Sequence, residues 1–251
     1  MTFRSLRRGL ASASATLSEL KTFLLLKVAP ARARDGLLVR LERLGGPSVW
    51  LLGTIHGGHL ETEAYSLAHL EAVLLHLHPA RLLVESRPEE VAAGNLADGP
   101  FEMGYMSLVA RAAGIPFDGV DWWDEDAVGL RRTNAEREGR IVRNIVARLP
   151  AVGSVLVLLG FSHIPELVER LREQGYVKAP ISSEERAMLF DTATISQRFP
   201  AGMAAALERR IAADERRLRE APASPVAGRV RDALAALRKL LVWVRAAGER
   251  S

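Results

Sequence analysis

Two histidines stand at matching places after two apolar segments of the chain. His56 ends the run Leu-Leu-Gly-Thr-Ile-His that begins at Leu51, and His163 ends the run Leu-Leu-Gly-Phe-Ser-His that begins at Leu158. Each apolar segment has the length of a buried strand, and the glycine at its end lets the chain turn sharply. Open α/β sheets bind ligands outside the carboxyl ends of their strands. The repeated pattern therefore predicts that both imidazoles lie in one crevice at one sheet edge.

Carboxylates follow two further short apolar runs in the same way. Glu85 comes directly after one such run and Asp121 after another. Two imidazoles and a carboxylate suit a divalent metal that keeps one position open for water, so His56, Glu85, Asp121 and His163 are candidate metal ligands. The same set also suits catalysis without metal, with a histidine as base and a glutamate that orients it. His59 is either a further ligand or an exposed loop residue.

The surrounding pattern alternates strands with helices. Residues 37–44, 49–53, 81–85, 117–120, 154–159 and 176–181 have the pattern of strands, and residues 62–77, 103–113, 133–149 and 166–174 that of helices. This alternation predicts an α/β fold with a central, largely parallel sheet. A basic helix over residues 5–28, ended by Pro30, precedes it, and a helical extension follows. The predicted organisation is an N-terminal helix (1–34), an α/β domain (35–199) and a basic helical extension (200–251).

Composition excludes several classes of protein. The 251 residues include no cysteine, which excludes disulfide scaffolds, thiolate zinc sites and cysteine nucleophiles, and 48% of them are apolar, enough for a substantial core. No run of about 18 uncharged apolar residues is present, so no transmembrane span is expected. The N-terminal segment also lacks the long apolar region of a secretory signal. We therefore expect a cytoplasmic protein.

The net charge of +4 is unevenly distributed. Residues 1–50 carry +6, residues 51–199 carry −7 and residues 200–251 carry +5. Few aromatic residues interleave with the basic tails to stack on bases, so no nucleic-acid partner is expected. An apolar stripe lies on the basic C-terminal helix, formed by Val226, Val230, Leu234, Leu237, Leu241 and Val244. We expect this stripe to pack on its own domain or on a twin subunit in a homodimer; peripheral contact with an anionic membrane is the alternative.

The motifs resemble those of the TraB/PrgY family, whose broad superfamily includes the TIKI proteases, the erythromycin esterases and the ChaN-like haem-binding proteins. The resemblance covers about residues 37–181. It rests on the order of its motifs, a GxxH, an acid, a Glu-Arg helix and a second GxxH, at residues 52–56, 84–87, 134–145 and 159–165.

This resemblance implies a duplicated strand–GxxH–helix core and a metal-dependent hydrolase of a peptide or other acyl bond. His56, Glu85 and His163 match the family's site and would hold manganese, cobalt or zinc. Arg137 matches its helix arginine and would stabilise developing negative charge, with Glu85 and Asp121 as further catalytic groups. The erythromycin esterases imply a metal-free alternative, and TraB-like inhibition of peptide signals implies a binding protein without turnover.

Overall fold

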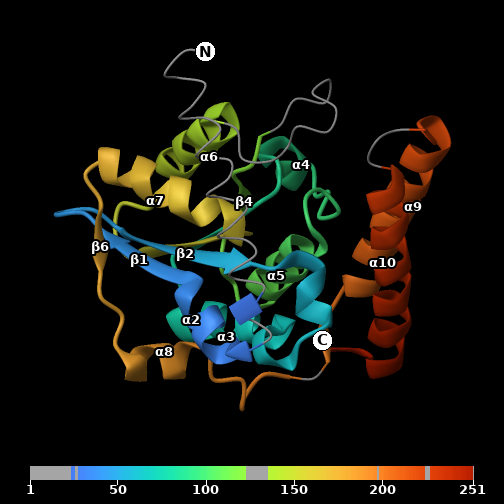
Figure 1. Ribbon diagram of the computed structural model, residues 1–251, viewed down its shortest axis with the longest axis horizontal. Helices are drawn as coiled ribbons and strands as arrows, with labels where there is room; N and C mark the ends of the chain where they lie inside the picture. The colour runs from blue at the N-terminus through green and yellow to red at the C-terminus, as the bar shows by residue number, and fades with distance from the viewer. Residues whose placement is uncertain (1–23, 26–27, 123–134, 197, 224–226, 251) are drawn as a thin grey trace.

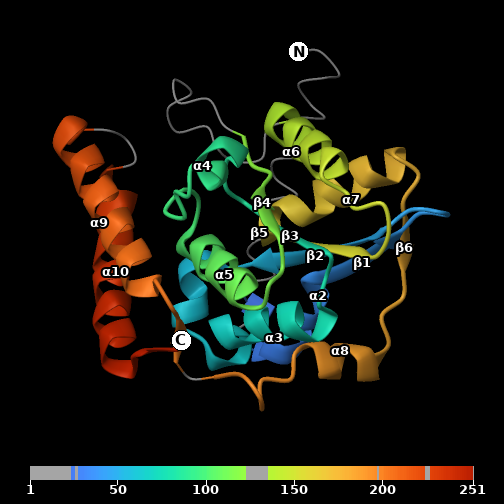
Figure 2. The same ribbon diagram turned by 180° about the vertical axis from the view of Figure 1, so that it is seen from behind.

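The computed structural model describes residues 24–25, 28–122, 135–196, 198–223 and 227–250. A twisted sheet lies at the centre, with helices on both of its faces and a pair of long helices standing at one side (Figure 1). Figure 2 shows the same three layers from behind, with α6 and α7 over one face and α3 and α5 over the other. The α/β architecture expected from the sequence is therefore confirmed.

The main sheet has six strands in the order β4-β3-β5-β2-β1-β6. Strands β4, β3, β5 and β2 run parallel, whereas β1 pairs antiparallel with both β2 and β6. The strands are β1 (Leu38–Glu42), β2 (Ser48–Thr54), β3 (Arg81–Val84), β4 (Phe117–Gly119), β5 (Ser154–Gly160) and β6 (Val177–Ala179). The sheet is thus mixed and mostly parallel, because the turn at residues 43–47 folds β1 back on β2 as a hairpin.

The helices connect these strands and continue beyond them. The α-helices are α2 (Pro30–Gly36), α3 (Leu67–Leu77), α4 (Pro88–Ala92), α5 (Phe101–Ala112), α6 (Ala135–Ala147), α7 (Ile164–Glu173), α8 (Ser183–Leu189), α9 (Met203–Glu220) and α10 (Ala227–Ala247). Short 3-10 turns are η1 (His56–Leu60), η2 (Glu63–Tyr65) and η3 (Phe161–His163). Two of these turns, η1 and η3, directly follow the central strands β2 and β5.

Burial on both faces explains why β2 and β5 occupy the centre. Both strands are almost continuously apolar, and six of the seven residues in each are buried. Alternate side chains of β5 enter two separate cores: Leu156 and Leu158 face α3 and α5, whereas Val155, Val157 and Leu159 face α6 and α7. This packing fixes the register of the strands whose carboxyl ends carry the candidate site.

Several local expectations are corrected by the structure. Helix α2, which begins at Pro30, was not expected; a proline suits the first turn because that position needs no N–H donor. The helix expected over residues 62–77 divides into η2 and α3 at Ser66, whose side chain and that of His69 form a capping box. Helices α4 and α8 were not expected. Most of the helix expected over residues 5–28 lies outside the described residues.

The C-terminal segment fastens the α9–α10 hairpin to the domain. Strands β7 (Phe199–Pro200) and β8 (Glu249–Arg250) pair in parallel. The Glu249 carboxylate accepts the N–H groups of Gly202, at 2.9 Å, and Ala204, at 2.7 Å, at the start of α9. The Arg250 guanidinium lies 2.6 Å from the buried carboxylate of Glu71 on α3. The first contacts join the two ends of the hairpin to each other, and the Arg250–Glu71 pair joins them to α3.

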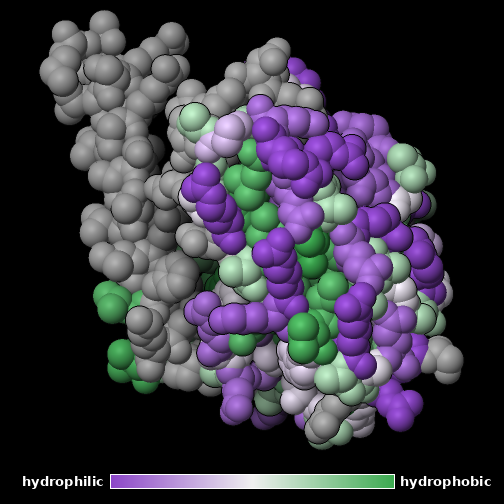
Figure 3. Space-filling view, turned by 90° about the vertical axis from the view of Figure 1, so that its right-hand side faces the viewer, coloured by the Kyte–Doolittle hydropathy of each residue, from purple (hydrophilic) through white to green (hydrophobic). Residues whose placement is uncertain are grey.

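The apolar stripe of α10 packs within the chain. Leu234, Leu237 and Val244 are buried, and Val230 and Leu241 are partly covered, whereas Val226 lies outside the described residues. Figure 3 shows the face formed by the hairpin, on which a line of hydrophobic side chains runs between bands of hydrophilic ones. No helix in the described parts of the chain is long and apolar enough to cross a bilayer.

Candidate functional site

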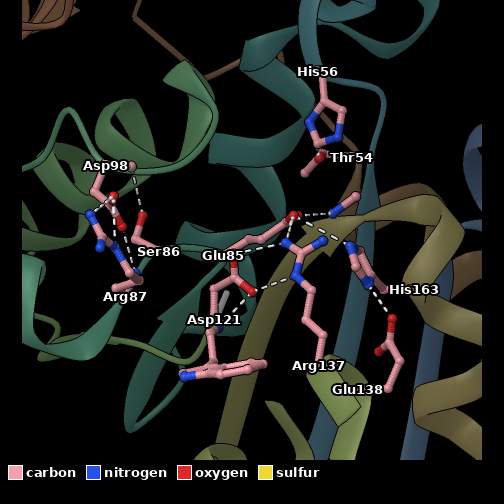
Figure 4. A network of polar contacts seen from close by, with 12 residues as sticks. Thr54, His56, Glu85, Ser86, Arg87, Asp98, Asp121, Arg137, Glu138 and His163 are labelled. Atoms are coloured by element: carbon pink, nitrogen blue, oxygen red, sulfur yellow. Dashed lines mark hydrogen bonds and ion pairs between the residues drawn. The ribbon is translucent and has the colours of Figure 1, made fainter. Parts of the chain in front are cut away.

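Four predicted residues meet at the carboxyl edge of the parallel strands. His56 follows β2, Glu85 follows β3, Asp121 follows β4 and His163 follows β5 through η3. Figure 4 shows Glu85 at the centre of this group, with His56 above it, His163 beside it and Arg137 below it. The expectation that the two histidines share one sheet edge is therefore confirmed.

Glu85 is the hub of a buried polar network. Its Oε1 accepts from Arg137 Nη2 at 2.8 Å and lies 3.3 Å from His163 Nε2, and its Oε2 accepts the N–H of Gly160 at 2.6 Å. Burial alone would favour the neutral acid. The cationic His163, His56 and Arg137 outweigh that effect and hold the pKa of Glu85 well below its usual range. Glu85 is therefore a fixed anion at neutral pH.

Arg137, in the first turn of α6, is held by two carboxylates. Its Nε donates to Asp121 Oδ1 at 2.8 Å, and its Nη2 donates to Asp121 Oδ2 at 2.7 Å and to Glu85 Oε1. Both Arg137 and Asp121 are buried. This bidentate pair gives the guanidinium one orientation. In the structure, Asp121 thus orients Arg137, and Arg137 in turn orients Glu85.

His163 is a buried imidazole with a carboxylate on each side. Its Nδ1 lies 2.6 Å from Glu138 Oε1, and its Nε2 faces Glu85. Burial disfavours the imidazolium, but Glu85 and Glu138 outweigh burial and raise the pKa of His163 to about 10. At neutral pH this ring is a cation that links α6 to the end of β3.

His56 has a similar carboxylate partner but different surroundings. Its Nδ1 lies 2.7 Å from Oε1 of Glu102, which also accepts from the Thr54 hydroxyl at 2.8 Å. The imidazole keeps 48% of its surface exposed, while the Glu102 carboxylate is fully buried. Burial disfavours the cation, yet Glu102 and then Glu85 outweigh it and raise the pKa of His56 to about 9. His56 is thus the member of this network that solvent reaches.

The backbone of His56 is unusual. Its φ is +49°, a left-handed conformation that is uncommon for residues other than glycine, although Asn, Asp and His adopt it more often than the rest. Such conformations persist where surrounding contacts fix them, and they concentrate at functional sites. The turn directs the ring from the end of β2 towards Glu102 on α5.

Two glycines make room for the opposite loop. A Cβ on Gly53 would lie 2.9 Å from Phe161 Cβ, and a Cβ on Gly160 would lie 2.8 Å from His56 Nε2. The two Leu-Leu-Gly-x-x-His motifs are not in register in the sheet. Gly160 of the second motif pairs with Thr54, the residue after Gly53 of the first. The glycines predicted to permit sharp turns therefore also allow the two strand-end loops to approach each other.

Substituting Gly160 tests this close approach. We expect Gly160→Ala to displace the His56 ring from Glu102, so that the pKa of His56 falls from about 9 towards 6.5. Gly57→Ala is the matched control, because a Cβ there meets nothing within 4 Å. NMR titration of the imidazole protons measures both variants. An unchanged His56 titration in a folded Gly160→Ala protein would show that the ring does not depend on this glycine.

Sequence reasoning missed two residues of this network, Glu102 and Glu138. Both are fully or almost fully buried on helices, and each lies on the Nδ1 side of one histidine. The position of Glu138 could have indicated its role, because it directly follows Arg137, which the family resemblance had already marked. The indication for Glu102 is weaker: it is the one charged residue of a helical segment between Pro100 and Arg111.

The predicted metal ligands lie near one another but are not arranged as a metal centre. The described residues contain no group of three or more His, Cys, Asp or Glu side chains that could hold a metal ion. Arg137 and His163 occupy Oε1 of Glu85, and the Gly160 N–H occupies Oε2. A divalent ion at Glu85 would therefore lie beside a guanidinium held in place by Asp121. This donor set does not fit the metal that the sequence resemblance implies.

Known proteins give no match to this chain: no family model, curated protein or solved structure matches it.

Proposed function

We propose that this protein hydrolyses an ester or other acyl bond at the His56 edge of the sheet, with a water molecule as nucleophile. The observation that carries the proposal is the pair formed by His56 and Glu102: a solvent-accessible imidazole whose Nδ1 is held by a fully buried carboxylate. In serine hydrolases the same pairing keeps the imidazole in one tautomer and stabilises its cation.

The chemistry follows from the two ring nitrogens. In neutral His56, Glu102 holds the proton on Nδ1, which leaves Nε2 free to accept a proton from water. The hydroxide formed adds to the acyl carbon, and the tetrahedral intermediate expels the leaving group. The imidazolium then returns its proton to the departing alkoxide or amine. One water is consumed, and an acid and an alcohol or amine are produced.

Buried residues around His56 support its role as a base. Thr54 donates to the same Glu102 oxygen and so limits its rotation, while Glu85 supplies a second negative charge that favours the imidazolium formed in the reaction. Arg137 and Asp121 hold Glu85 in place. These groups act through His56, because their burial keeps them from solvent.

The proposal also includes membership of the TraB/PrgY superfamily and a duplicated strand–GxxH–helix unit. The similarity of the loops after β2 and β5, each ending in a histidine that pairs with a carboxylate on a neighbouring helix, favours an origin by duplication. Within that superfamily, a metal-free esterase mechanism is the better match for this donor set, because Arg137 rather than a metal neutralises Glu85. The proposed substrate is a small ester or a peptide.

The rate should depend on pH through His56. Only the neutral ring can accept a proton, and the pKa of His56 is raised to about 9 by Glu102 and Glu85, opposed by burial and by His163. We therefore expect kcat/KM to rise about tenfold per pH unit below about pH 9 and to level off above it. Initial rates between pH 6 and pH 10.5 measure this profile. A rate that is flat from pH 7 to pH 9 would contradict a basic role for His56.

A hydrolysis assay with controlled metal content tests the function itself. Protein treated with EDTA and dialysed is assayed on p-nitrophenyl acetate, p-nitrophenyl butyrate and a fluorogenic peptide, with and without added manganese, cobalt or zinc. We expect ester turnover by the metal-free protein that exceeds turnover by His56→Gln. Activity that appears only with an added ion would favour the metal-dependent hydrolase.

A second function is favoured by the charge of the same ring. At neutral pH, His56 is an exposed cation, which suits capture of a carboxylate or another anion without turnover. Acetate and butyrate, the products of the ester assay, serve as probes. Perturbation of the His56 NMR signals by these anions, together with no hydrolysis of any substrate, would support a binding protein.

A further inference from the structure

His59 lies three residues after His56 and is almost completely buried. Its Nε2 accepts the N–H of Ile55 at 3.0 Å, and its Nδ1 lies 2.8 Å from the carbonyl oxygen of Tyr65. A backbone N–H can only donate and a carbonyl can only accept. The ring is therefore the neutral tautomer with its proton on Nδ1, and burial, the main cause, lowers its pKa. Both expectations for His59, a metal ligand or an exposed loop residue, are wrong for this arrangement.

Tyr65 closes the other side of the same turn. Its hydroxyl donates to the carbonyl oxygen of Gly53 at 2.7 Å, and its ring meets the His59 ring edge-on, with centroids 4.8 Å apart. The backbone is thus held at Gly53 and at Ile55. His56 is the next residue, and it has the left-handed φ of +49°.

We propose that His59 is a positioning residue that, together with Tyr65, holds the turn after β2 so that the His56 imidazole meets Glu102. The contacts of His59 are to backbone atoms on both sides of the loop, so they restrain the course of the chain rather than any ligand. His56 needs this restraint because its conformation is unfavourable without surrounding contacts. The link to catalysis rests on the proposed hydrolysis, whereas the positioning of His56 does not.

Two substitutions at His59 separate hydrogen bonding from bulk. His59→Leu fills the site but leaves the Ile55 N–H and the Tyr65 carbonyl unpaired. His59→Gln carries an acceptor and a donor on one amide and can replace both contacts. We expect the NMR-measured pKa of His56 to fall from about 9 towards 6.5 in His59→Leu and to recover in His59→Gln. At pH 10, where His56 is neutral in both proteins, we also expect kcat for ester hydrolysis to fall about 10–100-fold in His59→Leu, with little change in KM.

The two readouts distinguish the two ideas. If the unmodified protein hydrolyses no substrate, the proposed function fails, but the His56 titration still decides the positioning role. If His59→Leu leaves the His56 titration unchanged in a protein with normal circular dichroism, the positioning role is wrong. Should His59→Leu not fold, Tyr65→Phe removes only the bond to Gly53. A lowered His56 pKa in that variant supports the proposal, and an unchanged one overturns it.

Discussion

Replacing His56 with glutamine is expected to lower kcat for ester hydrolysis by about 10²–10⁴-fold, which is the usual contribution of a positioned general base. Glutamine keeps a polar side chain of similar reach, so Glu102 can retain a hydrogen bond. It cannot, however, accept a proton from water at any pH used. We therefore also expect the alkaline rise in rate to disappear. Initial-rate kinetics of both proteins from pH 6 to pH 10.5 make the comparison.

A matched substitution controls for general effects of removing a histidine. The control is His76→Gln. His76 lies near the end of α3, away from the candidate site, and its Nδ1 lies 3.4 Å from the carbonyl oxygen of Leu189. This variant should keep the rate and the pH profile of the unmodified protein. Equal rates for His56→Gln and His76→Gln would mean that His56 is not the base.

Replacing Arg137 with methionine is expected to destabilise the fold by about 3–5 kcal/mol, the typical cost of removing one partner from a buried charged network. Asp121 would lose both of its bonds from the guanidinium, and Glu85 would lose one. Methionine keeps much of the aliphatic length, so the loss reports mainly on charge. Urea unfolding at pH 7, followed by circular dichroism, measures the difference.

The control for this prediction is an exposed arginine on the neighbouring helix. Arg172 on α7 pairs with Glu169 at the surface, with more than half of each side chain accessible. Arg172→Met should therefore change the free energy of unfolding by less than about 1 kcal/mol. If both substitutions had the same small effect, Arg137 would not be needed to neutralise Glu85 and Asp121.

Much of the site could be predicted from the sequence because its residues directly follow strands. Runs such as Val155 to Leu159 are long and apolar enough to indicate buried strands, and parallel strands bring their carboxyl ends to one edge. The sequence therefore predicts that His56, Glu85, Asp121 and His163 lie together. Arg137 came from the resemblance of its helix to a known family.

The remaining parts depend on how helices pack, which local patterns do not encode. Glu102 and Glu138 lie on α5 and α6, and their contacts with His56 and His163 depend on where each helix crosses the sheet edge. The burial of His59 was not predicted for a related reason. Its partners are backbone atoms of a turn, and that turn has no sequence signature. Strand β6 was expected, but its antiparallel pairing with β1 depends on where α7 returns the chain to the sheet.

The ion pair between Arg250 and Glu71 has a consequence for how the chain is made. At a synthesis rate of about 5–20 residues per second, Arg250 leaves the ribosome about 10–40 s after Glu71. Until then the Glu71 carboxylate has the hydrogen bond from the Tyr105 hydroxyl but no guanidinium to balance its charge, and burying that charge would be costly. The α3–α5 layer therefore reaches its full stability only after residue 250 has been added. This contact makes the final packing of α3 depend on a residue that is synthesised much later.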